Sequence, residues 1–130
     1  METKYRRILL KVSGEALAGA KGTGFDDETM RSICSGIKQA YELGVQIGVV
    51  VGGGNFWRGR SSGEMERTCA DKIGMLATVM NCLALADALR QTGVPAVVQS
   101  AIVMPQIAAT YTRDDAVQAM DCLLYTSRCV

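Results

Sequence analysis

The sequence predicts an α/β fold, a three-layer sandwich built on a mainly parallel sheet. Three short apolar runs, the second of them rich in β-branched residues, alternate with longer stretches whose apolar residues recur at helical spacing. Strands that are apolar on both faces are typical of parallel sheets covered by helices on each side. With 130 residues, 48% hydrophobic and 21% charged, the chain can form one domain or one lobe of a larger enzyme.

The predicted elements follow one another as strand, helix, strand, helix, strand, helix. The strands are expected at residues 8–12, 45–51 and 95–103. The first helix is expected to be capped by Asp26 or Asp27 and to stop before Gly44. The second helix is expected over about residues 69–90, and the third over about residues 112–120. The glycines within residues 19–24, and the polar stretch 58–67, predict loops.

The composition excludes several classes of function. With 14 basic and 13 acidic residues the net charge is +1, so binding of nucleic acid or of a membrane surface is not expected. Because the chain contains no histidine, a histidine base and histidine metal ligands are excluded within it. The 5 cysteines form no CxxC pair and are expected to be free, mostly buried thiols. Without an export-type N-terminus or an unbroken apolar span, a soluble cytoplasmic protein is expected.

Two glycine-containing turns follow the first two predicted strands, at residues 11–14 (Lys-Val-Ser-Gly) and 52–55 (Gly-Gly-Gly-Asn). The carboxyl ends of parallel strands share one sheet edge, where ligands bind, so both turns are expected there. Turn N–H groups can bind phosphate, Lys11 adds a compact positive charge and Arg58 a planar one, as phosphoryl transfer requires. Neither turn matches the P-loop or the dinucleotide pattern, and each also fits a purely structural connection or a solvated lysine.

The second predicted helix is apolar almost all round. The apolar residues are Ile73, Met75, Leu76, Ala77, Val79, Met80, Leu83, Ala84, Leu85 and Leu89. Such a helix is buried on more than one side, so we expect one side on the sheet and the other in a subunit interface, or against a second lobe. Near its start, Asp71 either caps the helix or binds a ligand. Spacing does not support a further alternative, an acid–base pair of Asp71 with Glu15.

Three segments carry a specific resemblance to a known family. They are residues 7–17 (Arg-Ile-Leu-Leu-Lys-Val-Ser-Gly-Glu-Ala-Leu), residues 48–55 with the Arg58-Gly59 pair that follows, and residues 71–81 (Asp-Lys-Ile-Gly-Met-Leu-Ala-Thr-Val-Met-Asn). Together they resemble the opening strand and loop, the second glycine loop and the dimer-forming helix of UMP kinases of the amino-acid-kinase superfamily. The third segment distinguishes UMP kinases from the carbamate, acetylglutamate and aspartate kinases. The resemblance covers roughly residues 5–120.

The resemblance implies a kinase that transfers a phosphoryl group from ATP to UMP, giving UDP and ADP in pyrimidine nucleotide biosynthesis. Mg²⁺ would accompany ATP, and no residue of the chain is assigned as a metal ligand. By matching position, ATP would be contacted by Lys11, Val12, Ser13, Gly14, Gly54 and Arg58. UMP would be contacted by Gly53 and by Asp71, the latter through the ribose. Lys11 is the expected catalytic residue, because its charge would neutralise the transferring phosphoryl group.

The resemblance also implies a homohexamer, and residues 19–24 are similar to the segment with which family members bind GTP as an allosteric effector. Residues 1–121 are expected to form the N-terminal lobe, which binds UMP and forms the oligomer. Residues 122–130 do not resemble the family's continuation, and a sequencing or assembly artefact is the hypothesis for this tail. The chain is accordingly expected to have negligible turnover by itself. A different kinase of the superfamily and a non-catalytic assembly fragment remain as alternatives.

Overall fold

The computed structural model describes residues 2–57, 63–121 and 125–129. In its five-stranded sheet the order is β1-β2-β5-β3-β4, and each pair of neighbours is parallel. The strands are β1 (Arg7–Val12), β2 (Gln46–Val51), β3 (Ala96–Ser100), β4 (Ala109–Thr110) and β5 (Tyr125–Cys129). The helices are α1 (Gly14–Ala18), the 3-10 turn η1 (Gly19–Lys21), α2 (Asp27–Glu42), α3 (Arg67–Gln91) and α4 (Arg113–Asp121).

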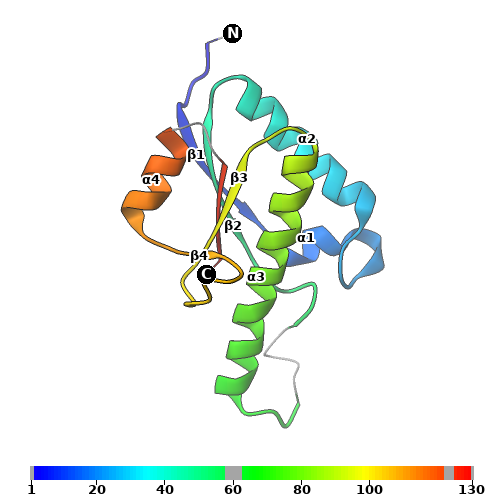
Figure 1. Cartoon of the computed structure of the whole chain (residues 1–130). Helices are drawn as coiled ribbons and strands as arrows, with labels where there is room; N and C mark the ends of the chain where they lie inside the picture. The colour runs from blue at the N-terminus through cyan, green and yellow to red at the C-terminus, as the bar shows by residue number, and fades with distance from the viewer. Residues whose placement is uncertain (1, 58–62, 122–124, 130) are drawn as a thin grey trace.

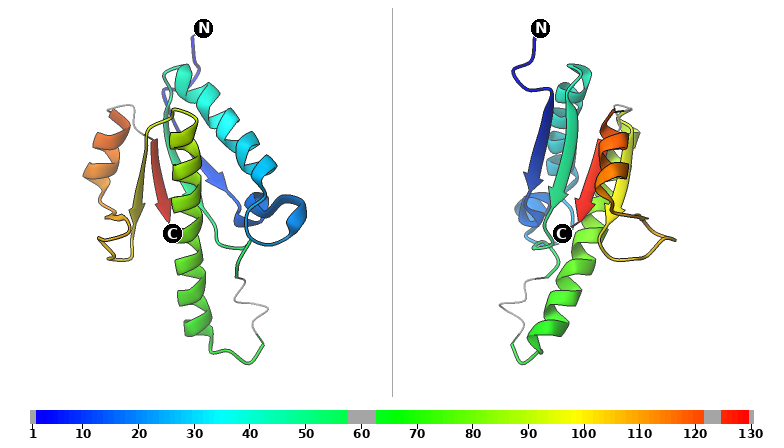
Figure 2. Two further views of the ribbon diagram at one scale, coloured as in Figure 1. Left: turned by 45° about the vertical axis from the view of Figure 1, so that its right-hand side comes forward. Right: turned by 90° about the vertical axis from the view of Figure 1, so that its left-hand side faces the viewer.

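Helices cover both faces of the sheet, as Figure 2 shows with α2 and α3 on one side and α4 on the other. Alternation along β2 explains the two faces, since successive side chains point in opposite directions. Ile47 and Val49 join the buried core beneath α2 and α3, whereas Gly48 faces α4, where an added Cβ would lie 3.8 Å from the sulfur of Met120. The predicted α/β sandwich on a parallel sheet is therefore confirmed.

The long helix α3 has two different halves. Its C-terminal half packs on the sheet, and Cys82, Leu85 and Leu89 are fully buried there. Its N-terminal half extends past the carboxyl edge of the sheet (Figure 1), and Met75 and Leu76 are 44% and 48% exposed. By length and composition α3 is the one described helix apolar enough to cross a membrane, a test that core helices also pass. The burial of its second half identifies it as a core helix.

The start of α2 confirms the predicted cap. The carboxylate of Asp26 accepts hydrogen bonds from the backbone N–H of Thr29 at 3.0 Å and from its hydroxyl at 2.7 Å. The hydroxyl bond is the main cause, and the backbone bond the second, of a lowered pKa for Asp26. At the other end Gly44 has a φ of +82°, a conformation that glycine adopts at little cost after a helix.

Several expectations need correction. The elements α1, β4 and β5 were not predicted, and β3 stops at Ser100, whose hydroxyl accepts from the N–H of Ile102 at 3.1 Å as the chain turns. Because α3 begins at Arg67, Asp71 lies in its second turn, so the capping alternative for Asp71 is wrong. Cys34 and Cys69 are free thiols, but Cys82 is disulfide-bonded, contrary to the prediction of free cysteines.

Candidate functional site

The two glycine turns predicted at one sheet edge are in direct contact. A Cβ added to Gly14 would lie only 2.6 Å from the carbonyl oxygen of Gly52 and 2.6 Å from the nitrogen of Gly54. The N–H of Gly52 also donates to the carbonyl of Val12 at 3.0 Å, which continues the pairing of β1 with β2 into the turns. Any residue larger than glycine at position 14 would therefore require the backbone of the turns to move. The prediction that both turns lie at one edge of the sheet is confirmed.

The second turn also packs closely on α3. A Cβ added to Gly53 would lie 2.9 Å from the Cβ of Ala77 and 2.9 Å from the carbonyl oxygen of Gly74. The carbonyl of Gly53 accepts from the N–H groups of the two residues after Asn55, at 3.1 and 3.2 Å. Within the described part of the chain the N–H groups of Gly53 and Gly54 donate no hydrogen bond, so both can bind an anionic ligand.

A buried pair of asparagines holds this turn against α3. The side-chain amide of Asn55 donates to Oδ1 of Asn81 at 2.9 Å, and the amide of Asn81 donates to Oδ1 of Asn55 at 2.7 Å. Asn81 donates again to the carbonyl of Gly52 at 2.6 Å. Both side chains are buried, 2% and 0% exposed. Sequence reasoning missed this pair, because an asparagine after three glycines reads as an ordinary turn residue.

The loop before α2 is attached to the same turn. Asn55 donates from its side chain to the carbonyl of Gly24 at 2.9 Å, and its own carbonyl accepts from the N–H of Gly24 at 3.1 Å and the hydroxyl of Thr23 at 3.0 Å. Next to these bonds the rings of Phe25 and Phe56 pack edge to face, with centroids 5.3 Å apart. The end of the segment predicted to resemble an effector loop thus contacts the glycine turn directly.

The residues predicted around the first turn differ in their environment. Lys11 lies in β1 opposite Val50, at the carboxyl edge, and is exposed. The side chain of Val12 belongs to the buried core, so only its backbone is available to a ligand. Ser13 precedes α1 in an extended conformation, and its hydroxyl makes no capping hydrogen bond. These residues adjoin the glycine contact, and their roles in binding remain predictions.

The two carboxylates Glu15 and Asp71, whose pairing the spacing did not support, lie on different helices, α1 and α3. Asp71 is exposed on α3, one turn before Gly74 and on the same side of the helix. Glu15 instead lies against the second turn, because a Cβ added to Gly54 would be 3.4 Å from its Oε1. Asp71 therefore lies beyond the edge of the sheet, one helical turn further from the sheet than the contact of Gly53 with α3. Arg58, the other predicted ligand, lies outside the described residues.

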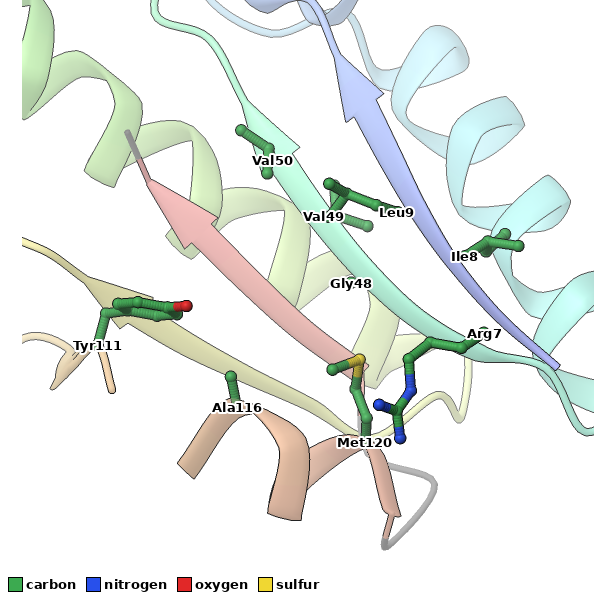
Figure 3. A pocket seen from close by; sticks show the side chains of 9 residues that line it. All are labelled: Arg7, Ile8, Leu9, Gly48, Val49, Val50, Tyr111, Ala116 and Met120. Carbon is green, nitrogen blue, oxygen red and sulfur yellow. The ribbon is translucent and has the colours of Figure 1, made fainter. Parts of the chain in front are cut away.

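Two cavities flank the first strands, and one of them reaches the first glycine turn at Lys11, Val12 and Ser13. One cavity of about 340 Å³ lies between α4 and the first two strands (Figure 3). It is lined by Arg7, Ile8, Leu9, Gly48, Val49, Val50, Tyr111, Ala116 and Met120. The guanidinium of Arg7 is held there by Asp121 at 2.8 Å and Gln46 at 2.7 Å. A second cavity, of about 440 Å³, separates α2 from the edge strand β1. Both are mainly apolar, so neither has the chemistry of a phosphate site.

Comparisons of the sequence and of the structure with known proteins point to the same family. The family model described as "Amino acid kinase family" matches residues 6–124. The chain is 51% identical over 122 residues to a protein named uridylate kinase from Limosilactobacillus reuteri (strain DSM 20016), an alignment that covers 92% of this chain and 51% of that protein.

Two solved structures share the fold. The UMP kinase of Bacillus anthracis superimposes with a TM-score of 0.92 at 33% identity, over 98% of this chain and 53% of that one. The UMP kinase of Ureaplasma parvum superimposes with a TM-score of 0.88 at 29% identity, over 98% of this chain and 55% of that one. The chain therefore spans about half the length of the relatives that it matches.

Proposed function

The chain belongs to the amino acid kinase family, and on that premise we propose that it is the N-terminal part of a UMP kinase, which transfers a phosphoryl group from ATP to UMP. The observation that carries the proposal is the contact of the two glycine turns at Gly14, beside the unbonded N–H groups of Gly53 and Gly54. The 51% identity to a uridylate kinase supports UMP as the acceptor over carbamate or an amino acid.

The proposed chemistry depends on position and charge. Phosphoryl transfer develops negative charge on the oxygens of the moving group, and fixed N–H donors and a cation stabilise it. The amides of Gly14 and Gly54 are held by backbone contacts and need little reorganisation, and Lys11 supplies the cation from the end of β1. Arg58 is proposed as the second cation on ATP. Ser13 adds a hydroxyl, and residue 12 its backbone.

The proposed UMP subsite lies on the α3 side of the turn. Gly53 touches α3 at Gly74 and Ala77, and Asp71 is one turn further from the sheet. A carboxylate there can accept hydrogen bonds from both ribose hydroxyls, while the Gly53 amide binds the phosphate. UMP bound in this way would lie along the exposed half of α3.

Mg²⁺ is proposed to arrive bound to ATP. Among the described residues no group of three or more Cys, Asp or Glu side chains is placed to hold a metal. Phosphate oxygens are usual ligands of Mg²⁺ in kinases. We therefore assign none of the described residues to the ion.

The assembly and regulation of the family are also proposed for this protein. The exposed Met75, Leu76 and Met80 of α3 form an apolar stripe suited to a subunit interface, as in a homohexamer. The contact of the 23–25 loop with the glycine turn is the path proposed for a GTP effect. A cytoplasmic location and a role in pyrimidine biosynthesis follow from the same proposal. The boundary proposed at residue 121 is tested by sequencing the gene beyond it.

The apolar stripe also favours a second candidate, a non-catalytic fragment that associates with full-length subunits. A substrate panel separates the candidates. We would join residues 1–121 to the C-terminal half of the Limosilactobacillus reuteri uridylate kinase and measure ADP production from ATP with UMP, carbamate, acetylglutamate or aspartate, using the intact relative as control. UMP-dependent turnover by the chimera, and none by the 130-residue chain, is expected. A folded chimera that prefers another acceptor, or that is inactive, contradicts the proposal.

A further inference from the structure

The four-residue turn after β2 is fixed at both of its ends by two side chains to which no role has been assigned. At the start, the carbonyl of Gly52 accepts from Asn81 at 2.6 Å. At the end, Asn55 is bonded through both its side chain and its carbonyl. Gly53 and Gly54, whose N–H groups are proposed to bind phosphate, lie between these two fixed points.

The hydrogen bonds of the asparagine pair leave no amide proton unused. Each side-chain amide has two N–H groups and one oxygen. Asn55 donates to Asn81 and to the carbonyl of Gly24, while Asn81 donates to Asn55 and to the carbonyl of Gly52. Because both outer partners are carbonyl oxygens, rotating either amide by half a turn would place two oxygens together. The pair therefore permits one orientation, and so one position of the turn on α3.

We propose that Asn55 and Asn81 are positioning residues, whose reciprocal amide pair sets the place of the Gly53 and Gly54 amides relative to α3 and to the first turn. The kinetic part of this inference rests on the proposed function. The pair does not touch the reacting atoms; it acts through the turn. Its loss is expected to reduce turnover and nucleotide affinity beyond what a comparable loss of stability causes, because small misplacements of binding groups are costly.

A carboxylate at position 81 gives the sharpest perturbation. In Asn81→Asp the shape is kept, but the group that donated to Gly52 and Asn55 becomes an oxygen facing two oxygens. Protonation restores one donor, and burial favours the neutral acid. The defect is therefore expected to be large at high pH and smaller at low pH. Glu15, the native carboxylate against the turn, is present in every variant compared.

The experiment compares Asn81→Asp with Leu89→Ala in the chimera described above. Leu89 is fully buried in the same helix, two turns further on, so its truncation lowers stability without reaching the turn. For Asn81→Asp we expect kcat/KM about tenfold or more below the unsubstituted value at about pH 8, and partial recovery near pH 6. For Leu89→Ala we expect a lower unfolding midpoint with kcat/KM within about twofold. A pH-independent ratio for Asn81→Asp, with a defect no larger than that of Leu89→Ala, overturns the proposal.

A second measurement keeps this test separate from the proposed function. Hydrogen exchange of the peptide 52–57 is followed in the 130-residue chain, with Asn81→Ala and Leu89→Ala compared. Exchange at least about tenfold faster in Asn81→Ala supports the positioning role even where the chimera does not phosphorylate UMP. Equal exchange in the two variants refutes it, whatever the activity of the chimera.

Discussion

The closest backbone contact in the site predicts a large effect from one methyl group. In Gly14→Ala the new Cβ would lie 2.6 Å from the Gly52 oxygen and the Gly54 nitrogen, against about 3.4 Å for ordinary contact. Both neighbours are backbone atoms, so the two turns must separate by about 0.8 Å. Overpacking of this kind costs about 1–3 kcal/mol of stability. A displacement approaching 1 Å at binding groups lowers kcat/KM by roughly 10²-fold.

The assay measures kcat/KM for UMP and the unfolding free energy of the chimera, with Gly36→Ala as the matched control. Gly36 lies within α2 and nothing lies within 4 Å of an added Cβ, so its replacement should leave activity unchanged and raise stability by about 0.5–1 kcal/mol. If Gly14→Ala retained kcat/KM within about twofold of the unsubstituted protein, the contact of the turns would not govern catalysis, and the reasoning would fail.

Four further predictions follow from single residues. Lys11→Ala should lower kcat by roughly 10²-fold or more with little change in KM, and normal turnover would refute its role. Asp71→Ala should mainly raise KM for UMP in steady-state kinetics; a change in stability alone would argue against a ribose contact. Burial raises the pKa of the Cys34 thiol, so mass spectrometry after brief alkylation should find exposed Cys69 modified first, and equal labelling would contradict this. The lowered pKa of Asp26 means that its stabilisation is present above its ordinary value of 3.8 and is lost as pH falls through the lowered value. Asp26→Asn should therefore unfold with a shallower pH dependence in acid, and parallel curves would exclude this cap as the cause.

The sequence predicted most of what depends on local pattern. The first two apolar runs form β1 and β2 at nearly the expected bounds, and Asp26 caps α2 as expected. The common edge for the two glycine turns followed from parallel strands alone, and Gly14 shows how close they come. These features depend on residues near one another in sequence, or on a rule of sheet topology.

What the sequence did not show depends on contacts between distant residues. The partner of Asn55 is 26 positions away on α3, and neither asparagine belongs to a periodic pattern. The strand β4 is two residues long and β5 lies in the unpredicted tail, so neither presents an apolar run of useful length. The sequence placed the start of α3 at about residue 69, whereas the helix begins at Arg67 after a cap, Glu66, that makes no side-chain hydrogen bond to the helix. Because the helix starts earlier than expected, Asp71 lies in its second turn.

Hydrogen exchange of the chimera with and without nucleotide tests most directly whether the two glycine turns bind phosphate. Saturating ATP with Mg²⁺ is expected to slow exchange in the peptides 11–15 and 52–57, and UMP to slow exchange in 52–57 and around Asp71. Nucleotide binding with protection confined to the hollow beside α4, near Tyr111 and Met120, and with no change in the turns, would contradict the account.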